Sequence, residues 1–444
     1  MTPKKILLLS VSAGAGHARA AEALRVAADA QGAVATHLDA MDFVPDGFRT
    51  LYTEWYLSLV NRQPALWGYL YEKTNRADPA SLSQRLRRKI ERLNTRALVR
   101  AIDESGADAI VCTHFLPAEL LSTLATRGEC TTPLWVQVTD FDLHRLWVHP
   151  HMAGYFAGND EIAFRLQAAS ISPQTIHVTG IPIMPAFGAA PDRVACADQL
   201  GLDAAMPTVL LMGGGAGIGG LDEVAARLMR IETPFQLVVL AGKNQDALAR
   251  LHAMPEAKNG RLFPLGFTPH VERAMAVADV AITKPGGLST SECLAMGLPM
   301  ILNSPIPGQE ERNADYLLEQ GAALKASDAV TLEYRLRNLL SSPATLATMR
   351  ENARRIARGL DHIDKDVEPA FPILPQQHLH QGVRIGQRRG LRRHHDDDRL
   401  GGCGKVRHSG GNAGARIDQQ NVHGGREAFQ LFLQNQLLRL RQNC

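Results

Sequence analysis

Residues 277–292 have the sequence VADVAITKPGGLSTSE, which carries the clearest structural signal in the chain. Val277 to Ile282 is a short apolar run rich in β-branched residues, typical of a buried parallel strand. The chain then turns at Pro285-Gly286-Gly287, and the Ser289-Thr290-Ser291 run after it supplies candidate N-caps for a helix. Free backbone N–H groups and the positive end of a helix dipole meet at such a turn, where glycine lets a phosphate approach. The pattern therefore predicts an anion site in an α/β domain.

Polar side chains surround this predicted site. Glu292 is expected in the first turn of the helix, where its carboxylate could accept two hydrogen bonds from a ribose diol. The next strand, residues 299–303, leads to Gln309-Glu310, and open parallel sheets bind ligands at the carboxyl ends of their strands. An ordinary helix N-terminus would explain the glycines and serines, but not Glu292 and the Gln309-Glu310 pair at these spacings. The spacing therefore favours a ligand site over an ordinary helix start.

These residues resemble the nucleotide-sugar half of the family 28 glycosyltransferases, especially the diacylglycerol glycosyltransferases, meaning monogalactosyldiacylglycerol synthase and the processive diacylglycerol glucosyltransferases. The residues that carry the resemblance are Gly286-Gly287, Ser289-Thr290, Glu292, Gly297-Leu298-Pro299, Gly308-Gln309-Glu310 and Asn313. The resemblance implies an α/β fold of GT-B architecture, with two Rossmann-like domains facing across a cleft. Residues 1–180 would form the acceptor domain, 181–206 a linker, and 207–360 the UDP-sugar domain.

A second glycine-rich loop, GGGAGIGG at 213–220, follows the apolar run Thr208–Met212. A glycine loop between a strand and a helix is typical of a phosphate loop, although such loops also serve as flexible connectors. The resemblance implies that this loop and the first turn bind the diphosphate, that the backbone of Phe267 holds uracil, and that Gln309 and Glu310 meet the sugar hydroxyls. The expected diphosphate residues are Gly213, Gly214, Gly215, Gly217, Gly286, Gly287, Ser289 and Thr290, with Asn313 also on the donor side.

The N-terminus repeats the pattern of strand, glycine loop and helix, and it contains Gly14, Gly16 and His17. A neutral imidazole at a helix N-terminus could act as a general base, and the resemblance places His17 on the acceptor side with the two glycines. The alternative is a histidine that only caps the helix. Asp140 follows the strand-like run 134–139 and could orient His17 or be the base itself.

Asp140-Phe141-Asp142 has the spacing of a metal-binding Asp-x-Asp motif. The resembling family holds diphosphate with helix ends instead, so we expect no metal and no cofactor, with the UDP-sugar as co-substrate.

Residues 51–75 are rich in aromatic side chains, and a basic run follows them. Tyrosine and tryptophan suit a membrane interface or lipid pocket, and basic residues attract anionic headgroups. The alternative is an ordinary core with a solvated basic face; nucleic-acid binding is not expected, because no recognised motif accompanies the charges. The residues assigned to the acceptor or membrane side are Trp55, Trp67, Arg85, Arg87, Arg88, Lys89 and Trp147.

The composition agrees with a soluble two-domain protein: 444 residues, 45% hydrophobic and 21% charged. Its six cysteines show no paired or metal-like spacing, which favours reduced thiols in the cytosol. The start superficially resembles a signal peptide, but the apolar segment Ile6–Leu9 is short and runs into glycines. No run of eighteen apolar residues predicts a membrane span. We therefore expect a peripheral protein at the cytoplasmic face of a membrane.

Residues 361–444 differ in amino-acid composition from the rest of the chain and lie outside the resemblance. They contain frequent glycines, paired arginines and a contiguous His394-His395-Asp396-Asp397-Asp398 run, whose spacing is typical of nonspecific chelation. A low-order tail is expected there, and its composition resembles an out-of-frame translation.

The resemblance implies an inverting hexosyltransferase of glycolipid biosynthesis, which moves a hexose from UDP-glucose or UDP-galactose to diacylglycerol or a related glycolipid. A base would take the proton of the acceptor hydroxyl as its oxygen attacks the anomeric carbon. Two alternatives stay open: a UDP-sugar 2-epimerase of the same architecture, and a non-catalytic, membrane-associated UDP-sugar-binding protein. The aromatic and basic residues 51–100 argue against the epimerase, which needs no lipid surface.

Overall fold

The computed structural model describes residues 3–12, 14–44, 49, 63–76, 96–189, 191–213 and 220–357. Residues Met1–Val367 form one compact unit. Several expectations lie outside the described residues: those for Trp55, Arg85, Arg87, Arg88, Lys89, Gly214, Gly215, Gly217 and the tail 361–444.

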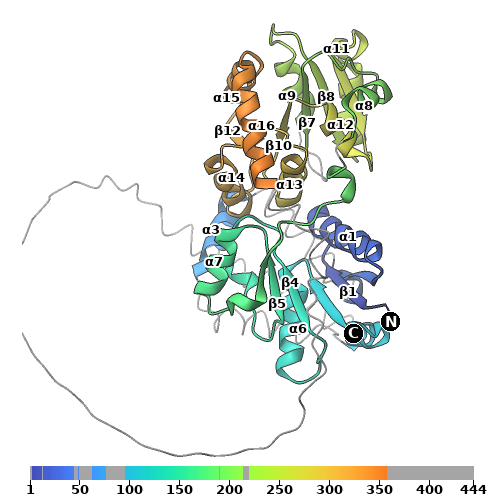
Figure 1. Ribbon diagram of the computed structural model, residues 1–444. Coiled ribbons are helices and arrows are strands. Elements are labelled where there is room, and N and C mark those ends of the chain that lie inside the picture. Colours follow the sequence, from blue (N-terminus) through green and yellow to red (C-terminus); the bar gives the residue numbers. More distant parts are fainter. Residues whose placement is uncertain are drawn as a thin grey trace, which may run out of the picture. The chain divides into compact units, whose positions relative to one another are not determined.

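The first half of the described chain is built on a parallel sheet with the strand order β2-β1-β3-β4-β5-β6. Figure 1 labels β1, β4 and β5 of this sheet. Its strands are β1 (Lys5–Ser10), β2 (Val34–Asp39), β3 (Ala109–Cys112), β4 (Leu134–Gln137), β5 (Gly154–Ala157) and β6 (Ile176–Val178). The helices of this half are α1 (Ala15–Ala30), α3 (Pro64–Arg76), α5 (Arg96–Ser105), α6 (Phe115–Thr126) and α7 (Asp160–Ala168). Short 3-10 turns are η1 (Ala40–Phe43), η2 (Arg145–Trp147), η3 (Pro173–Thr175) and η4 (Pro185–Phe187).

The second half is built on another parallel sheet, with the order β12-β11-β10-β7-β8-β9. Its strands are β7 (Thr208–Met212), β8 (Gln236–Gly242), β9 (Leu262–Gly266), β10 (Val280–Thr283), β11 (Met300–Asn303) and β12 (Ala323–Ala326). Its helices are α8 (Arg193–Leu200), α9 (Leu221–Leu228), α10 (Gln245–Ala253), α11 (Pro255–Lys258), α12 (Val271–Val277), α13 (Gly287–Ala295), α14 (Gln309–Glu319), α15 (Ala329–Leu340) and α16 (Pro343–Ala357).

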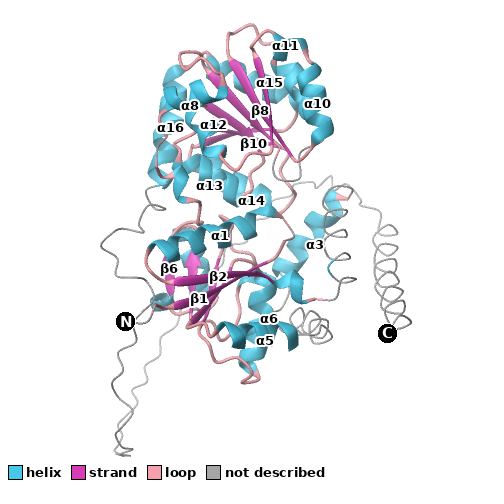
Figure 2. Ribbon diagram, turned by 90° about the vertical axis from the view of Figure 1, so that its right-hand side faces the viewer, coloured by secondary structure: helices cyan, strands magenta, loops and turns pink. Residues whose placement is uncertain are grey.

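Both sheets have the layered α/β organisation that the sequence predicts. Strands β3, β4, β5, β7 and β10 are buried along their whole length, because helices cover both faces of a parallel sheet. Figure 2 shows β8 and β10 flanked by helices on both sides. The order of the second sheet is that of the classical Rossmann fold, whose ligands bind where the strand order reverses. That position lies between β1 and β3 in one sheet and between β7 and β10 in the other.

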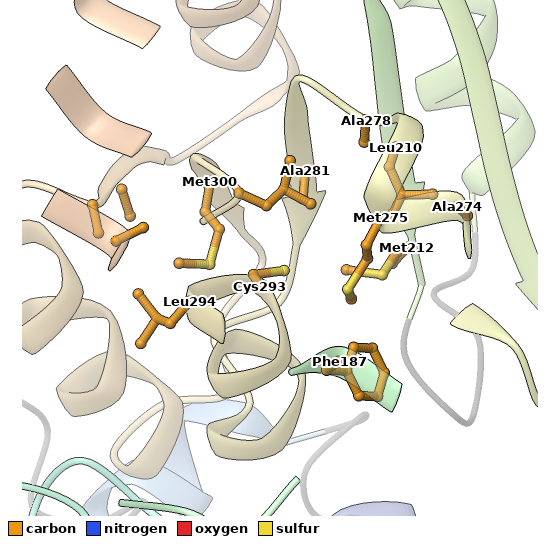
Figure 3. Packing of buried hydrophobic residues seen from close by; sticks show 14 of the residues in the cluster. Phe187, Leu210, Met212, Ala274, Met275, Ala278, Ala281, Cys293, Leu294 and Met300 are labelled. Carbon is orange, nitrogen blue, oxygen red and sulfur yellow. The ribbon is translucent and has the colours of Figure 1, made fainter. Parts of the chain in front are cut away.

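The core of the second half is filled by sulfur-containing, aromatic and aliphatic side chains. Met212 of β7 and Met275 of α12 lie close to Phe187 (Figure 3). The same buried cluster includes Ala20 of α1 and Phe141, so apolar packing continues between the two halves. Burying one such side chain stabilises the fold by about 1.5–3 kcal/mol.

Local boundaries differ from the expectations in three places. The strand expected at 277–282 begins at Val280, because Val277 ends α12. The helix of the glycine turn begins at Gly287 with Gly286 as its N-cap, so the Ser289-Thr290-Ser291 run lies inside it. Glu292 is therefore in the second turn and not the first.

The predicted linker 181–206 contains α8, which packs against α12. The expected domain limits remain a prediction. Among the described residues, no helix has both the length and the apolar content needed to cross a bilayer.

Candidate active site

Turns from the two halves meet at the carboxyl ends of their central strands. A Cβ atom added to Gly287, at the start of α13, would overlap the carbonyl oxygen of Thr139, which follows β4. A Cβ at Gly16 would lie 4.0 Å from the Cβ of Leu288. Gly287 is therefore needed for the close approach of the two backbones, and the predicted diphosphate turn lies directly against the predicted acceptor side.

The ring of His17 is held by backbone and hydroxyl groups of the first half. Its Nδ1 lies 2.8 Å from the carbonyl oxygen of Thr113 and 3.0 Å from Oγ1 of Thr139. A carbonyl oxygen can only accept, so Nδ1 carries a proton and donates a hydrogen bond to the carbonyl oxygen of Thr113. Nε2 then keeps its lone pair, as a general base requires.

Burial lowers the pKa of His17 below its ordinary value of 6.5, while the charge of Asp140 and the bond to Thr113 oppose this shift. His114 packs edge-on against His17, with ring centroids 4.6 Å apart, and burial holds its own pKa well below 6.5. The Nδ1 atom of His114 accepts from the backbone N–H of Leu116. Both rings are therefore neutral at neutral pH, so His17 can accept a proton.

Asp140 is buried beside this ring but forms its hydrogen bonds with the second half. Its Oδ1 accepts from Nε2 of Gln309 at 2.7 Å and from Nδ2 of Asn313 at 3.3 Å. Burial raises the pKa of Asp140, and the bond from Gln309 is the largest opposing effect. Thr113 and Thr139 therefore orient the His17 ring by hydrogen bonds, whereas Asp140 acts on it through its charge.

Thr113 and Thr139 are functional candidates that received no role from the sequence. Thr113 comes one residue after β3 ends and Thr139 two residues after β4, at the edge where ligands bind. Their position after strand ends could have identified them as site residues. The neighbouring sequence does not show which atoms they contact.

Glu292 lies on α13 and is almost completely buried, with 5% of its surface exposed. Its Oε1 forms an ion pair with Nη2 of Arg19 on α1, at 3.1 Å. Burial raises the pKa of Glu292 to about 7, against the opposing charge of Arg19. Arg19 was not among the predicted residues, because an arginine on an alanine-rich helix gives no local sign of such a partner.

The side chains predicted to meet the sugar lie together at the start of α14. Oε2 of Glu310 accepts from the backbone N–H of Ile306 at 2.7 Å, and burial raises the pKa of Glu310. Gln309 donates to Asp140, as described above. Asn313 is fully buried, one helical turn further along.

The predicted diphosphate residues also lie at strand ends. Gly213 follows β7, and Gly286 and Gly287 start α13. The hydroxyl of Thr290 donates back to the carbonyl oxygen of Gly286 at 2.8 Å, as mid-helix threonines commonly do, while Ser289 is half-buried. The turn therefore offers backbone N–H groups at the start of α13.

The predicted uracil residue lies at the carboxyl end of another strand of the same sheet. Phe267 follows β9 and has 64% of its surface exposed. Nζ of Lys243 lies 5.6 Å from the centroid of its ring. Lys243 is a further neighbour of the donor side that sequence reasoning did not identify.

The predicted acceptor and membrane residues fall into different environments. Gly14 has a φ of 154°, which L side chains rarely adopt, and it precedes α1. Trp67 is half-buried on α3. Trp147 has only 2% of its surface exposed, and its ring centroid lies 6.3 Å from that of His17, so of its two expected places only the acceptor side stays a prediction. A tryptophan in that position can shape a pocket beside His17 but cannot insert into a bilayer.

Asp142 lies against two arginines of neighbouring helices. Its carboxylate lies 3.3 Å from Arg165 and 3.4 Å from Arg312. In the part of the chain that the structure describes, no group of His, Cys, Asp and Glu side chains is arranged to hold a metal ion.

Comparisons with known proteins identify the family of the chain. Residues 17–183 match the family model of monogalactosyldiacylglycerol (MGDG) synthase, and residues 208–365 match the C-terminal domain of glycosyltransferase family 28. The processive diacylglycerol β-glucosyltransferase of Bacillus pumilus is 27% identical, over 80% of this chain and 91% of its own length. The enzyme of the same name from Staphylococcus saprophyticus is 30% identical, over 61% and 69%. The chloroplastic monogalactosyldiacylglycerol synthase of Spinacia oleracea is 30% identical, over 72% and 63%.

Solved structures show the same fold at low sequence identity. The UDP-GlcNAc 2-epimerase of Neisseria meningitidis, bound to UDP-GlcNAc, has a TM-score of 0.50 and 13% identity, over 81% of this chain and 98% of that chain. The calicheamicin glycosyltransferase CalG4 also has a TM-score of 0.50 and 13% identity, over 81% and 94%. An epimerase and a transferase thus share the fold, which is the predicted GT-B architecture with two Rossmann-like sheets. With both halves matched by family models and with these relatives, the chain belongs to glycosyltransferase family 28, as a hexosyltransferase of the group that contains the diacylglycerol glycosyltransferases.

Proposed function

We propose that this enzyme transfers a hexose from a UDP-sugar to diacylglycerol or a related glycolipid, with inversion at the anomeric carbon. The observation that carries the proposal is the position of Asp140, which interacts by charge with His17 of the first half and accepts a hydrogen bond from Gln309 of the second. A candidate base on one half thereby lies beside a side chain on the other half that is predicted to contact the sugar. The names of the matched relatives support diacylglycerol as the acceptor.

The acceptor hydroxyl would lie against Nε2 of His17. In the proposed reaction this nitrogen, or the carboxylate of Asp140, takes the hydroxyl proton as the oxygen attacks the anomeric carbon. The bond from that carbon to the UDP oxygen breaks, and UDP leaves with the bonding electrons. A single displacement of this kind inverts the anomeric configuration.

The leaving diphosphate would be stabilised by the second half. Backbone N–H groups at the start of α13 would supply fixed donors, and the helix dipole would add a favourable field. Glu292 would accept from the ribose diol, and the backbone at Phe267 would hold uracil. No metal or cofactor enters this scheme, in which the donor is UDP-glucose or UDP-galactose.

The proposed division of labour assigns residues 1–180 to the acceptor, 181–206 to the linker and 207–360 to the donor. The acceptor half would lie at the cytoplasmic face of an anionic membrane. On the described part of α3, Leu66 and Tyr69 are 39% and 51% exposed, which supports contact with lipid. Vesicle co-sedimentation tests this: replacing Arg85, Arg87, Arg88 and Lys89 together with Ser should reduce binding to anionic vesicles. Equal binding of both proteins to neutral and anionic vesicles would contradict it.

The transfer itself is tested with radiolabelled UDP-glucose and UDP-galactose and vesicles that contain diacylglycerol. We expect a labelled lipid whose anomeric proton shows the β configuration by NMR, because the sugar of these donors is α-linked. Conversion of the UDP-sugar without lipid would point to an epimerase. Binding of UDP-sugar without turnover would point to a non-catalytic binding protein.

A further inference from the structure

Two side-chain amides on α14 contact a single oxygen atom in the other half of the protein. Gln309 and Asn313 are four residues apart and therefore lie on the same face of the helix. Both donate a hydrogen bond to Oδ1 of Asp140, at 2.7 and 3.3 Å. Oδ2 of Asp140 is not part of either bond.

Asn313 makes further contacts that fix its position. Its Oδ1 accepts from the backbone N–H of Phe141 at 2.8 Å, and its Nδ2 also donates to the carbonyl oxygen of Pro285 at 3.2 Å. The residue is 0% exposed. With both amide protons and the amide oxygen engaged, Asn313 has little capacity left to bind a sugar.

We propose that Gln309 and Asn313 form an amide clamp that positions the Asp140 carboxylate for the transfer reaction. Asn313 is the permanent arm of this clamp and is a positioning residue, not a contact of the donor sugar. Gln309 is the exchangeable arm, because a bound sugar would compete for its amide. The inference rests on the proposed function, in which Asp140 takes a proton or stabilises protonated His17.

The clamp has a chemical consequence because amide N–H groups donate only to an acceptor. They favour the ionised carboxylate over the neutral acid, which opposes the effect of burial on Asp140. The other titratable groups that interact with Asp140 are His17 on α1, Tyr71 on α3, Asp142 on its own loop and Glu310 on α14. Of these, only His17 can lower the pKa of Asp140 by its charge, and the hydrogen bond from Gln309 is the largest effect that opposes burial.

The test is the pH dependence of kcat in Asn313→Ala, measured as glycolipid formation on vesicles. The active form needs ionised Asp140 whichever group takes the proton. Losing one donor should therefore move the acid limb of the profile to higher pH, by about one unit. We expect kcat to fall about tenfold at neutral pH while the affinity for UDP, measured by calorimetry, changes less than twofold.

Asn159→Ser is the matched control. Asn159 donates from Nδ2 to the carbonyl oxygen of Phe141, in the same loop, but does not contact Asp140; serine retains an oxygen that can cap α7. This variant should leave the acid limb in place. An equal shift in Asn159→Ser would show that loop displacement, not the clamp, moves the profile.

A double-mutant cycle separates positioning from simple destabilisation. In the Asp140→Ala background, Asn313→Ala should lower kcat by less than twofold, because the oxygen that accepts from Asn313 is gone. A full tenfold loss in that background, or weaker UDP binding with an unmoved acid limb, would overturn the proposal. If the wild-type protein forms no glycolipid, the proposed function fails instead, so the two failures are distinguishable.

Discussion

Glu292 is expected to make the ligand-free protein less stable at alkaline pH, and Glu292→Gln should remove that cost. The side chain is buried on α13, and its pKa is raised from 4.5 to about 7 even with Arg19 at 3.1 Å. Below about pH 4.5 the carboxyl is protonated in both the folded and unfolded states, so the raised pKa costs nothing. Between pH 4.5 and 7 only the unfolded state ionises, and stability falls as the pH rises.

The size of the effect follows from the shift. A change of about 2.5 pKa units corresponds to about 3 kcal/mol at 1.36 kcal/mol per unit. Glutamine mimics the neutral acid, so Glu292→Gln should be more stable than wild type by up to about 3 kcal/mol at pH 8 and nearly equal at pH 4.5. For a folded part of roughly 350 residues, this is an increase of about 4–5 °C in the thermal midpoint.

The assay is thermal unfolding at pH 4.5 and pH 8, together with titration calorimetry of UDP. Arg19→Ala is the matched partner variant: it removes the favourable charge, so it should lower the thermal midpoint at pH 8 and change it little at pH 4.5. UDP affinity of Glu292→Gln should fall about tenfold to hundredfold, because the ribose loses a charged acceptor worth about 1.5–3 kcal/mol. A lower midpoint of Glu292→Gln at pH 8 would refute the reasoning and make the ion pair net stabilising. Unchanged UDP affinity would refute the ribose assignment.

Three further outcomes are expected. His17→Gln should lower kcat by about a hundredfold to ten-thousandfold and keep UDP affinity; nearly normal turnover would assign the proton transfer to Asp140. Turnover should persist in excess EDTA, and a loss that Mn²⁺ or Mg²⁺ restores would revive Asp140-Phe141-Asp142 as a metal motif. Gly287→Ala should cost about 1–3 kcal/mol of stability and lower turnover, because its Cβ would overlap the Thr139 carbonyl. Gly188→Ala, whose Cβ would lie 3.6 Å from the nearest atom, is the control that should change neither.

Local pattern was sufficient for many of the strands and for the glycine turns between strand and helix, but it did not identify β2 or β12. Fully buried parallel strands are short apolar runs, and glycines follow them wherever a helix must start close to another backbone, so β7, β10 and α13 could be expected from composition alone. The helix start was misjudged because Ser289, Thr290 and Ser291 resemble N-caps. In the fold the hydroxyls of Thr290 and Ser291 instead donate to the carbonyl oxygens of Gly286 and Gly287. Which role they take depends on the residue at which the helix begins.

Tertiary structure alone decided which side chains meet at the candidate active site. The bonds that hold the His17 ring join it to residues 96 and 122 positions away, and Arg19 pairs with Glu292 across 273 positions. Propensity and periodicity act over one or two turns of chain, so they place a histidine at the start of a helix without identifying its partner. Asn313 illustrates the limit: its sequence position suggested only a place on the donor side, whereas packing buries it completely and engages its amide with Asp140, Phe141 and Pro285. Such partners are selected by the packing of one sheet's turns against the other's, which no short stretch of sequence contains.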